Sequence, residues 1–134
     1  MTEECVFCQI IRQQSPSTPV YEDATVMAFL SNRPINPGHT LVVPKKHSEN
    51  IFQIDDEEIA HIYKVTKRVS SAVNNAIQPE GVRIVQNNGE AAGQVISHFH
   101  VHVIPMYKQS APFHGEIRER DKLENEAKKI RQFI

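Results

Sequence analysis

The chain has 134 residues, of which 40% are hydrophobic and 23% are charged, the composition of an ordinary globular domain. Fifteen Lys and Arg side chains balance sixteen Asp and Glu side chains, so no strong overall charge attracts nucleic acid or an anionic membrane. The acidic N-terminus lacks the features of a signal peptide, and no apolar stretch reaches the roughly 18 residues of a membrane span. We expect one domain over residues 1–134, a cytoplasmic location, and neither nucleic acid nor a membrane as partner.

The first third of the chain predicts a short helix followed by two strands. Apolar residues recur at helical spacing within residues 5–12, and a segment rich in Ser and Pro then ends the helix. Residues 20–23 lead through a predicted turn into a strand at residues 26–30. After a loop rich in Pro and Asn, the β-branched residues 39–44 predict a second strand, and antiparallel pairing with the first is the simplest topology.

The rest of the chain alternates between helical and strand-like patterns. Asp55 or Asp56 is a candidate N-cap for a long amphipathic helix, which ends at a Pro-Glu-Gly segment. Strands are predicted at residues 82–86 and 98–104, and a turn region rich in Gly and Asn lies between them. Apolar residues at helical spacing within residues 116–134 indicate an amphipathic C-terminal helix. The fold class is therefore α+β, with an antiparallel sheet and helices packed on it.

Three histidines alternate with apolar residues in the last predicted strand. Because successive side chains of a strand point to opposite faces, His98, His100 and His102 share one face and the residues between them face the core. Such a row indicates either a metal centre or a catalytic face that binds phosphate. Phosphate is favoured, since Glu90 is the only acid nearby. The preceding turn supplies amide and main-chain donors that suit phosphate oxygens, at Asn87, Asn88, Gly89, Gly93 and Gln94.

Several motifs of this chain resemble those of the histidine-triad (HIT) nucleotide hydrolases and transferases. The alternating histidines of residues 98–104 match the motif of that family. Residues 5–11, residues 36–47 and the turn that begins at Asn87 extend the match to nearly all of residues 4–107. The resemblance implies a HIT-like fold with about five antiparallel strands, one long helix and additional short helices. It also implies a purine nucleotide substrate and a homodimer.

The resemblance assigns roles around the phosphate. It implies that His100 attacks the α-phosphorus and forms a covalent nucleotidyl-histidine, a role that suits a neutral imidazole near pH 7. His102 and Gln94 are expected to contact the transferring phosphate with help from Asn87, and His39 is expected to orient the triad from behind. The implied catalytic residues are His39, His98, His100 and His102, with Gly93 in the phosphate-binding turn.

The nucleoside is expected against the early strands. Phe29 and Leu30 are expected to line an apolar slot for the base, and Ser31 and Asn32 to face the ribose. Two positions depart from the family pattern. Ser31 stands where many members have an acidic or amide residue, and Val95 stands where Ser or Thr is common.

The Cys-x-x-Cys motif has three interpretations. A redox site of this spacing normally follows a strand, and no strand is predicted before Cys5. Two buried, inert thiols that pack the short helix are the second interpretation. A structural zinc ion, the third, needs two more nitrogen or sulfur ligands. His47 and His98 resemble the ligands that accompany paired cysteines in zinc-bearing relatives, so we favour a structural Zn²⁺ held by Cys5, Cys8, His47 and His98.

Three functions remain open from the sequence. The leading hypothesis is a hydrolase that attacks the α-phosphate of a nucleoside phosphoramidate or of a dinucleoside polyphosphate such as diadenosine tetraphosphate. The alternative is a regulatory adaptor that binds nucleotides with little turnover. The third hypothesis is a metal-dependent enzyme in which the triad itself holds the active metal.

Overall fold

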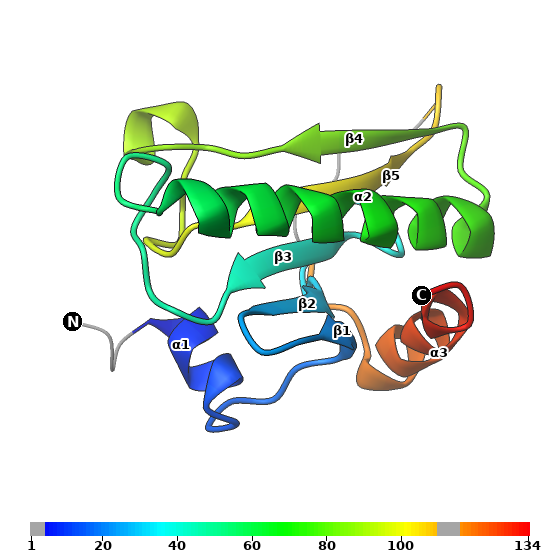
Figure 1. The fold of residues 1–134 in the computed structure, drawn as a ribbon. Helices are drawn as coiled ribbons and strands as arrows, with labels where there is room; N and C mark the ends of the chain where they lie inside the picture. Colours follow the sequence, from blue (N-terminus) through cyan, green and yellow to red (C-terminus); the bar gives the residue numbers. More distant parts are fainter. Residues whose placement is uncertain (1–4, 110–115) are drawn as a thin grey trace.

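A five-stranded antiparallel sheet forms the centre of the molecule, and the computed structural model describes residues 5–109 and 116–134 (Figure 1). The strands lie in the order β1-β2-β3-β5-β4. In chain order the elements are α1 Val6–Ile11, β1 Pro19–Glu22, β2 Val26–Leu30, β3 Thr40–Pro44, α2 Asp56–Ile77, β4 Gly81–Val85, the 3-10 turn η2 Glu90–Ala92, β5 Val101–Met106 and α3 Arg120–Arg131.

The α+β class and the antiparallel pairing of β2 with β3 are confirmed. Strand β1 was not predicted, because it is four residues long, starts at Pro19 and pairs with β2 through an irregular register between Pro19 and Tyr21. Helix α3 occupies only the middle of the predicted 116–134 segment. Asp55 is the N-cap residue of α2, but its side chain forms no capping hydrogen bond.

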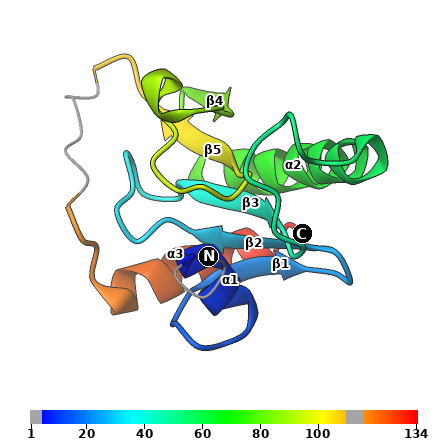
Figure 2. The same ribbon diagram turned by 90° about the vertical axis from the view of Figure 1, so that its left-hand side faces the viewer.

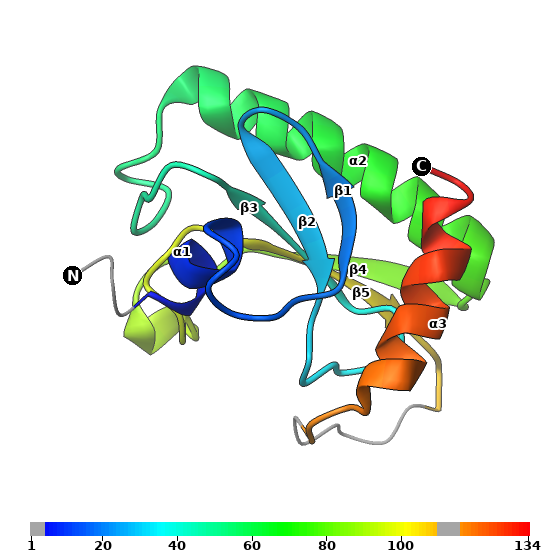
Figure 3. The same ribbon diagram turned by 90° about the horizontal axis from the view of Figure 1, so that it is seen from below.

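The sheet separates two apolar clusters. On one face, α2 and α3 pack over alternate residues of the strands, including Ala28, Val42, Val101 and Val103. On the other face, α1 packs over Met27, Phe29, Leu41 and Val43. Figure 3 shows α1 and α3 at opposite ends of the molecule. The alternation expected for the histidine segment is confirmed on its apolar side, since the first cluster contains Phe99, Val101 and Val103.

The ladder of β5 begins at Val101, three residues later than the sequence predicts. In the register of β3 with β5, Val42 lies opposite Val101, so Phe99 would lie opposite Pro44. Proline has no N–H to donate, and the ladder ends before it. The N–H of Phe99 instead donates to the Ser48 carbonyl at 2.7 Å. His98 and His100 therefore lie on irregular chain, which frees their main-chain groups for other bonds.

Among the described residues, no helix combines the length and apolar character needed to cross a membrane.

His114, expected in a solvated loop, lies outside the described residues. His61, expected to be solvated on α2, is half exposed and its Nε2 lies 2.7 Å from the Asp23 carboxylate.

Gly38 shapes the loop that leads into β3, and we expect its replacement by alanine to destabilise the fold. Gly38 has φ +97°, and a Cβ there would lie 2.9 Å from the Ile77 side chain. The positive φ and the clash predict that Gly38→Ala lowers the free energy of unfolding by about 1–3 kcal/mol in urea titration. Gly81→Ala is the control, because a Cβ at Gly81 meets nothing within 4 Å. Equal effects of the two variants would contradict this account.

Candidate active site and metal centre

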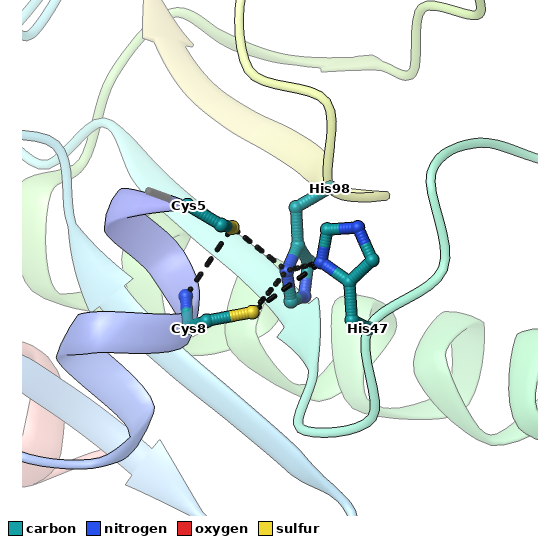
Figure 4. A group of neighbouring side chains, drawn as sticks. All are labelled: Cys5, Cys8, His47 and His98. Atoms are coloured by element: carbon teal, nitrogen blue, oxygen red, sulfur yellow. Dashed lines mark hydrogen bonds between the residues drawn. The ribbon is translucent and has the colours of Figure 1, made fainter. Parts of the chain in front are cut away.

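Four side chains from three separate segments converge beside the N-terminal end of β5 (Figure 4). Cys5 and Cys8 come from α1 and its cap, His47 from the chain after β3, and His98 from the chain before β5. Their donor atoms all lie within 4.8 Å of one another. The sequence prediction of this set of four is thus matched by a cluster of the same four residues. His100 and His102 do not belong to it.

The spacing of the donor atoms fits a tetrahedral zinc ion. The Nδ1 atom of His98 lies 3.4 Å from Cys5 Sγ, 3.5 Å from Cys8 Sγ and 3.2 Å from His47 Nδ1. Cys8 Sγ lies 3.3 Å from His47 Nδ1. Zinc bonds of about 2.0–2.3 Å at tetrahedral angles place neighbouring ligand atoms about 3.3–3.8 Å apart. Two sulfurs and two nitrogens also form a closed structural set for zinc.

A main-chain hydrogen bond directs His98 into the cluster. Its Nε2–H donates to the carbonyl of Pro44 at 2.8 Å, so in the neutral ring the lone pair lies on Nδ1, among the other donors. Burial lowers the pKa of His98 to about 4 and keeps the ring neutral. This bond is the outer-shell support that zinc-binding histidines commonly have. The same residue is fully buried, which fixes its orientation further.

Protonation of the Cys8 thiol competes with metal binding at the cluster. Burial, and then the nearby Cys5, raise the pKa of the Cys8 thiol to about 11 in the metal-free protein. Zinc binding must therefore displace a proton from this sulfur, which makes metal affinity dependent on pH. Cys5 Sγ also accepts a hydrogen bond from the N–H of Cys8 at 3.4 Å and so caps α1.

His100 has its two ring nitrogens in different environments. Its Nδ1–H donates to the main-chain carbonyl of His98 at 2.6 Å, which leaves the lone pair of the neutral ring on Nε2. Burial lowers the pKa of His100, so the neutral form dominates near pH 7. A neutral imidazole with a lone pair on Nε2 is suited to nucleophilic attack.

A chain of two hydrogen bonds sets the tautomer of His102. The main-chain N–H of Ile35 donates to His39 Nδ1 at 3.0 Å, so the proton of a neutral His39 is on Nε2. That Nε2–H donates to His102 Nδ1 at 2.9 Å, which leaves His102 with an N–H on Nε2. Burial is the first cause that lowers the pKa of His39 to about 3 and that of His102 to about 4. The ring centroids of His100 and His102 are 4.9 Å apart.

The expected base slot is corrected at one residue. Phe29 is buried in the cluster under α1, whereas Leu30 belongs to the cluster on the opposite face of the sheet. Adjacent residues of a strand point to opposite faces, so the two cannot line one slot. Phe29, Leu41 and His102 lie in register across β2, β3 and β5 and share one face.

The residues expected to face the ribose lie in the loop after β2. Ser31 Oγ accepts the N–H of Arg33 at 3.2 Å, and the Asn32 carbonyl accepts the N–H of Arg118 at 2.9 Å. The segment before α3 therefore lies against this loop, as Figure 2 shows. The Asn32 side chain is exposed.

The turn before the histidines is organised by Gln94. Its side-chain NH₂ donates to the carbonyls of Glu49 and Ile96 at 2.6 and 3.0 Å, and its Oε1 accepts the N–H of Gly89 at 2.8 Å. Gln94 thus fixes the turn in this conformation, and its expected contact with the phosphate stays a prediction. Gly93 has φ +97°, and a Cβ there would lie 3.5 Å from Asn87 Nδ2. Val95 is 87% exposed.

One residue of the site was missed from the sequence. The buried ring of Phe7 packs edge-on against His98, His100 and Phe29, with centroid distances of 5.8, 5.1 and 5.5 Å. Its apolar position in α1 indicated only a core residue. The position between two cysteines was the one feature that could have singled it out.

We expect purified protein to contain about one zinc ion per chain, and expect both Cys5→Ser and Cys8→Ser to lose it. Elemental analysis of freshly purified protein measures this directly. His61→Asn is the control, since it removes a histidine that lies outside the cluster. Zinc retained at wild-type level in both cysteine variants would contradict the assignment.

The burial of neutral His39 predicts a dependence of stability on pH. The pKa of His39 is about 3 in the folded protein and about 6.5 in the unfolded chain, so its stabilising contribution is complete above pH 6.5 and is lost as the pH falls. Between pH 6 and pH 5 the residue adds about 1 kcal/mol to the loss of unfolding free energy. His39→Gln is expected to reduce that slope by this amount in urea titrations at several pH values. An unchanged slope would mean that His39 is not buried as a neutral ring.

Comparisons with known proteins agree with this geometry. A family model described as HIT domain matches residues 12–109. The chain is 40% identical over 111 residues to Protein hit of Bacillus subtilis, covering 83% of this chain and 77% of that protein. It is 38% identical over 101 residues to the adenosine 5'-monophosphoramidase of Schizosaccharomyces pombe, covering 75% of this chain and 73% of that protein.

Solved structures give the same result. A HIT-like protein from Bartonella henselae, described as involved in cell-cycle regulation, superposes with a TM-score of 0.94 at 37% identity, covering 98% of this chain and 97% of that chain. A zinc-bound histidine triad family protein from Mycobacterium smegmatis superposes with a TM-score of 0.86 at 31% identity, covering 98% and 94%. The resemblance noted in the sequence and the zinc expected at the Cys and His cluster are therefore confirmed, and the chain belongs to the histidine triad (HIT) family.

Proposed function

We propose that this protein is a nucleotide hydrolase or transferase that attacks the α-phosphate of a purine nucleotide conjugate through His100. The observation that carries the proposal is the 2.6 Å hydrogen bond from His100 Nδ1 to the His98 carbonyl, which leaves the Nε2 lone pair for the phosphorus. The similarity to an adenosine 5'-monophosphoramidase supports an adenosine phosphoramidate as the first substrate to test.

In the proposed reaction His100 acts in two displacements. Its Nε2 lone pair forms a bond to the α-phosphorus while the bond from phosphorus to the leaving nitrogen or oxygen breaks, and the leaving atom takes a proton from solvent. Water then attacks the same phosphorus, gives a proton back to solvent, and releases the nucleotide and a neutral His100. The Nε2–H of His102 stabilises charge on the phosphoryl oxygens in both steps, because His39 holds its ring in the donating tautomer.

The zinc site serves structure in this scheme. Zinc, when bound to Cys5, Cys8, His47 and His98, supplies a closed coordination centre that fastens α1 to the chain before β5. His98 thus holds the metal with its ring and holds His100 with its carbonyl. An active metal ion held by the triad is disfavoured, because His98 lies in the metal cluster and His100 and His102 do not.

We further propose that two copies of the chain form a homodimer. Strand β4 lies at the edge of the sheet, and its Ile84 is 43% exposed. An edge strand with open hydrogen-bonding groups is a ready partner for a second copy. A cytoplasmic location and a single domain over residues 1–134 stay predictions.

The proposal predicts that His100→Ala lowers kcat by on the order of 10³-fold or more while nucleotide binding remains. The assay is a turnover screen of adenosine and guanosine phosphoramidates against dinucleoside tri- and tetraphosphates, with products identified. His61→Asn is the matched control and is expected to keep wild-type activity, because His61 lies on α2 across the sheet.

Two outcomes would change the assignment. Turnover that is slow in the wild type and unchanged in His100→Ala would remove His100 as the nucleophile and favour the adaptor function. The second outcome concerns the metal. Removal of zinc from folded protein abolishes activity, zinc alone restores it, and His100→Ala still turns over substrate. These three results together would show that the metal is not purely structural.

A further inference from the structure

Phe7 lies between Cys5 and Cys8 in the sequence, and its ring contacts two histidines in space. It follows Cys5 by two residues and precedes Cys8 by one, on the six-residue helix α1. Its ring is 5% exposed and meets the rings of His98 and His100 edge-on, at interplanar angles of 77° and 81°. The helix that carries the thiols therefore contacts the ring of the proposed nucleophile directly.

A second contact joins the same two places through the main chain. His98 directs Nδ1 into the cluster and Nε2–H to the Pro44 carbonyl, which fixes the plane of its ring. Its own carbonyl accepts the Nδ1–H of His100 at 2.6 Å. A shift of His98 therefore moves the acceptor that selects the tautomer of His100.

The metal determines how firmly these contacts are held. A helix of six residues is not stable by itself in water, so α1 depends on its packing and on its ligands. Without a cation, the lone pair of His98 Nδ1 lies 3.2 Å from His47 Nδ1, and no more than one proton can bridge these two nitrogens. Binding of zinc to all four donors would join Cys5 and Cys8 to both histidines at once and fix the position of α1, and hence that of Phe7.

We propose that Phe7 is a positioning residue that couples the metal cluster to His100, so that zinc occupancy determines the orientation of the His100 ring. The coupling rests on the proposed function only in naming His100 the nucleophile. The contacts themselves do not depend on the reaction. In this account zinc affects the site through Phe7 and the His98 carbonyl, without touching the substrate.

The test is imidazole ¹H–¹⁵N NMR of the full chain with and without zinc, in the absence of nucleotide. In the wild type, removal of zinc should shift or broaden the His100 ring signals and leave those of His61, held by Asp23 across the sheet, in place. Zinc-loaded Phe7→Leu should show His100 signals like those of the zinc-free wild type, while His47 and His98 keep their metal-bound signals. Ile10→Val, which trims the same helix and apolar cluster, should resemble the zinc-loaded wild type.

Each outcome decides the proposal. His100 signals that are the same with and without zinc in the wild type overturn it, and this comparison needs no variant to fold. Unchanged His100 signals in zinc-loaded Phe7→Leu remove Phe7 from the coupling and overturn it as well.

Kinetics supply an independent measurement. Zinc-loaded Phe7→Leu should lower kcat about tenfold or more with KM within about twofold. A higher KM with unchanged kcat would show that Phe7 contacts the nucleotide rather than positions His100, and would overturn the proposal. If the wild type turns over no substrate, the proposed function fails while the NMR comparison still decides the coupling.

Discussion

Hydrogen bonds between imidazoles and the main chain are the constraint on which this site depends. A neutral imidazole can place its proton on either nitrogen, and each choice gives a different chemistry. The Pro44 carbonyl, the His98 carbonyl and the Ile35 amide make that choice for His98, His100 and His39. Three similar side chains thus become suited to three different proposed roles, as metal ligand, nucleophile and orienting group, because the fold presents a different main-chain partner to each.

The sheet explains how those partners come together. Pairing of β3 with β5 places Leu41 opposite His102, and the ladder stops where Pro44 has no N–H to offer. The chain before β5 then leaves the ladder, and its carbonyls become available to side chains. The loop before β3, shaped by Gly38, delivers His39 to His102 from the other side. Irregular backbone at the strand ends is therefore as important to the site as the strands themselves.

Much of this arrangement could be predicted from the sequence, because it depends on local patterns. A continuous run of residues with strand-like composition located β2, and the spacing of apolar residues located α2. Short and irregular β1 carries too few residues to show a pattern. Leu30 was wrongly predicted to line the base slot together with Phe29, because adjacent residues of a strand point to opposite faces of the sheet. Phe7 and the tautomers depend on contacts between distant segments, and no local pattern of a chain encodes those contacts.

The position of the proton on each imidazole ring determines what that histidine can bind or attack. Neutron diffraction from deuterium-exchanged, zinc-loaded crystals near pH 7 measures it most directly. We predict deuterium on Nδ1 of His100 and on Nε2 of His39, His98 and His102, with zinc on Nδ1 of His98. Deuterium on Nε2 of His100 with a bare Nδ1 would contradict the account, since the nitrogen assigned to attack phosphorus would then carry no lone pair.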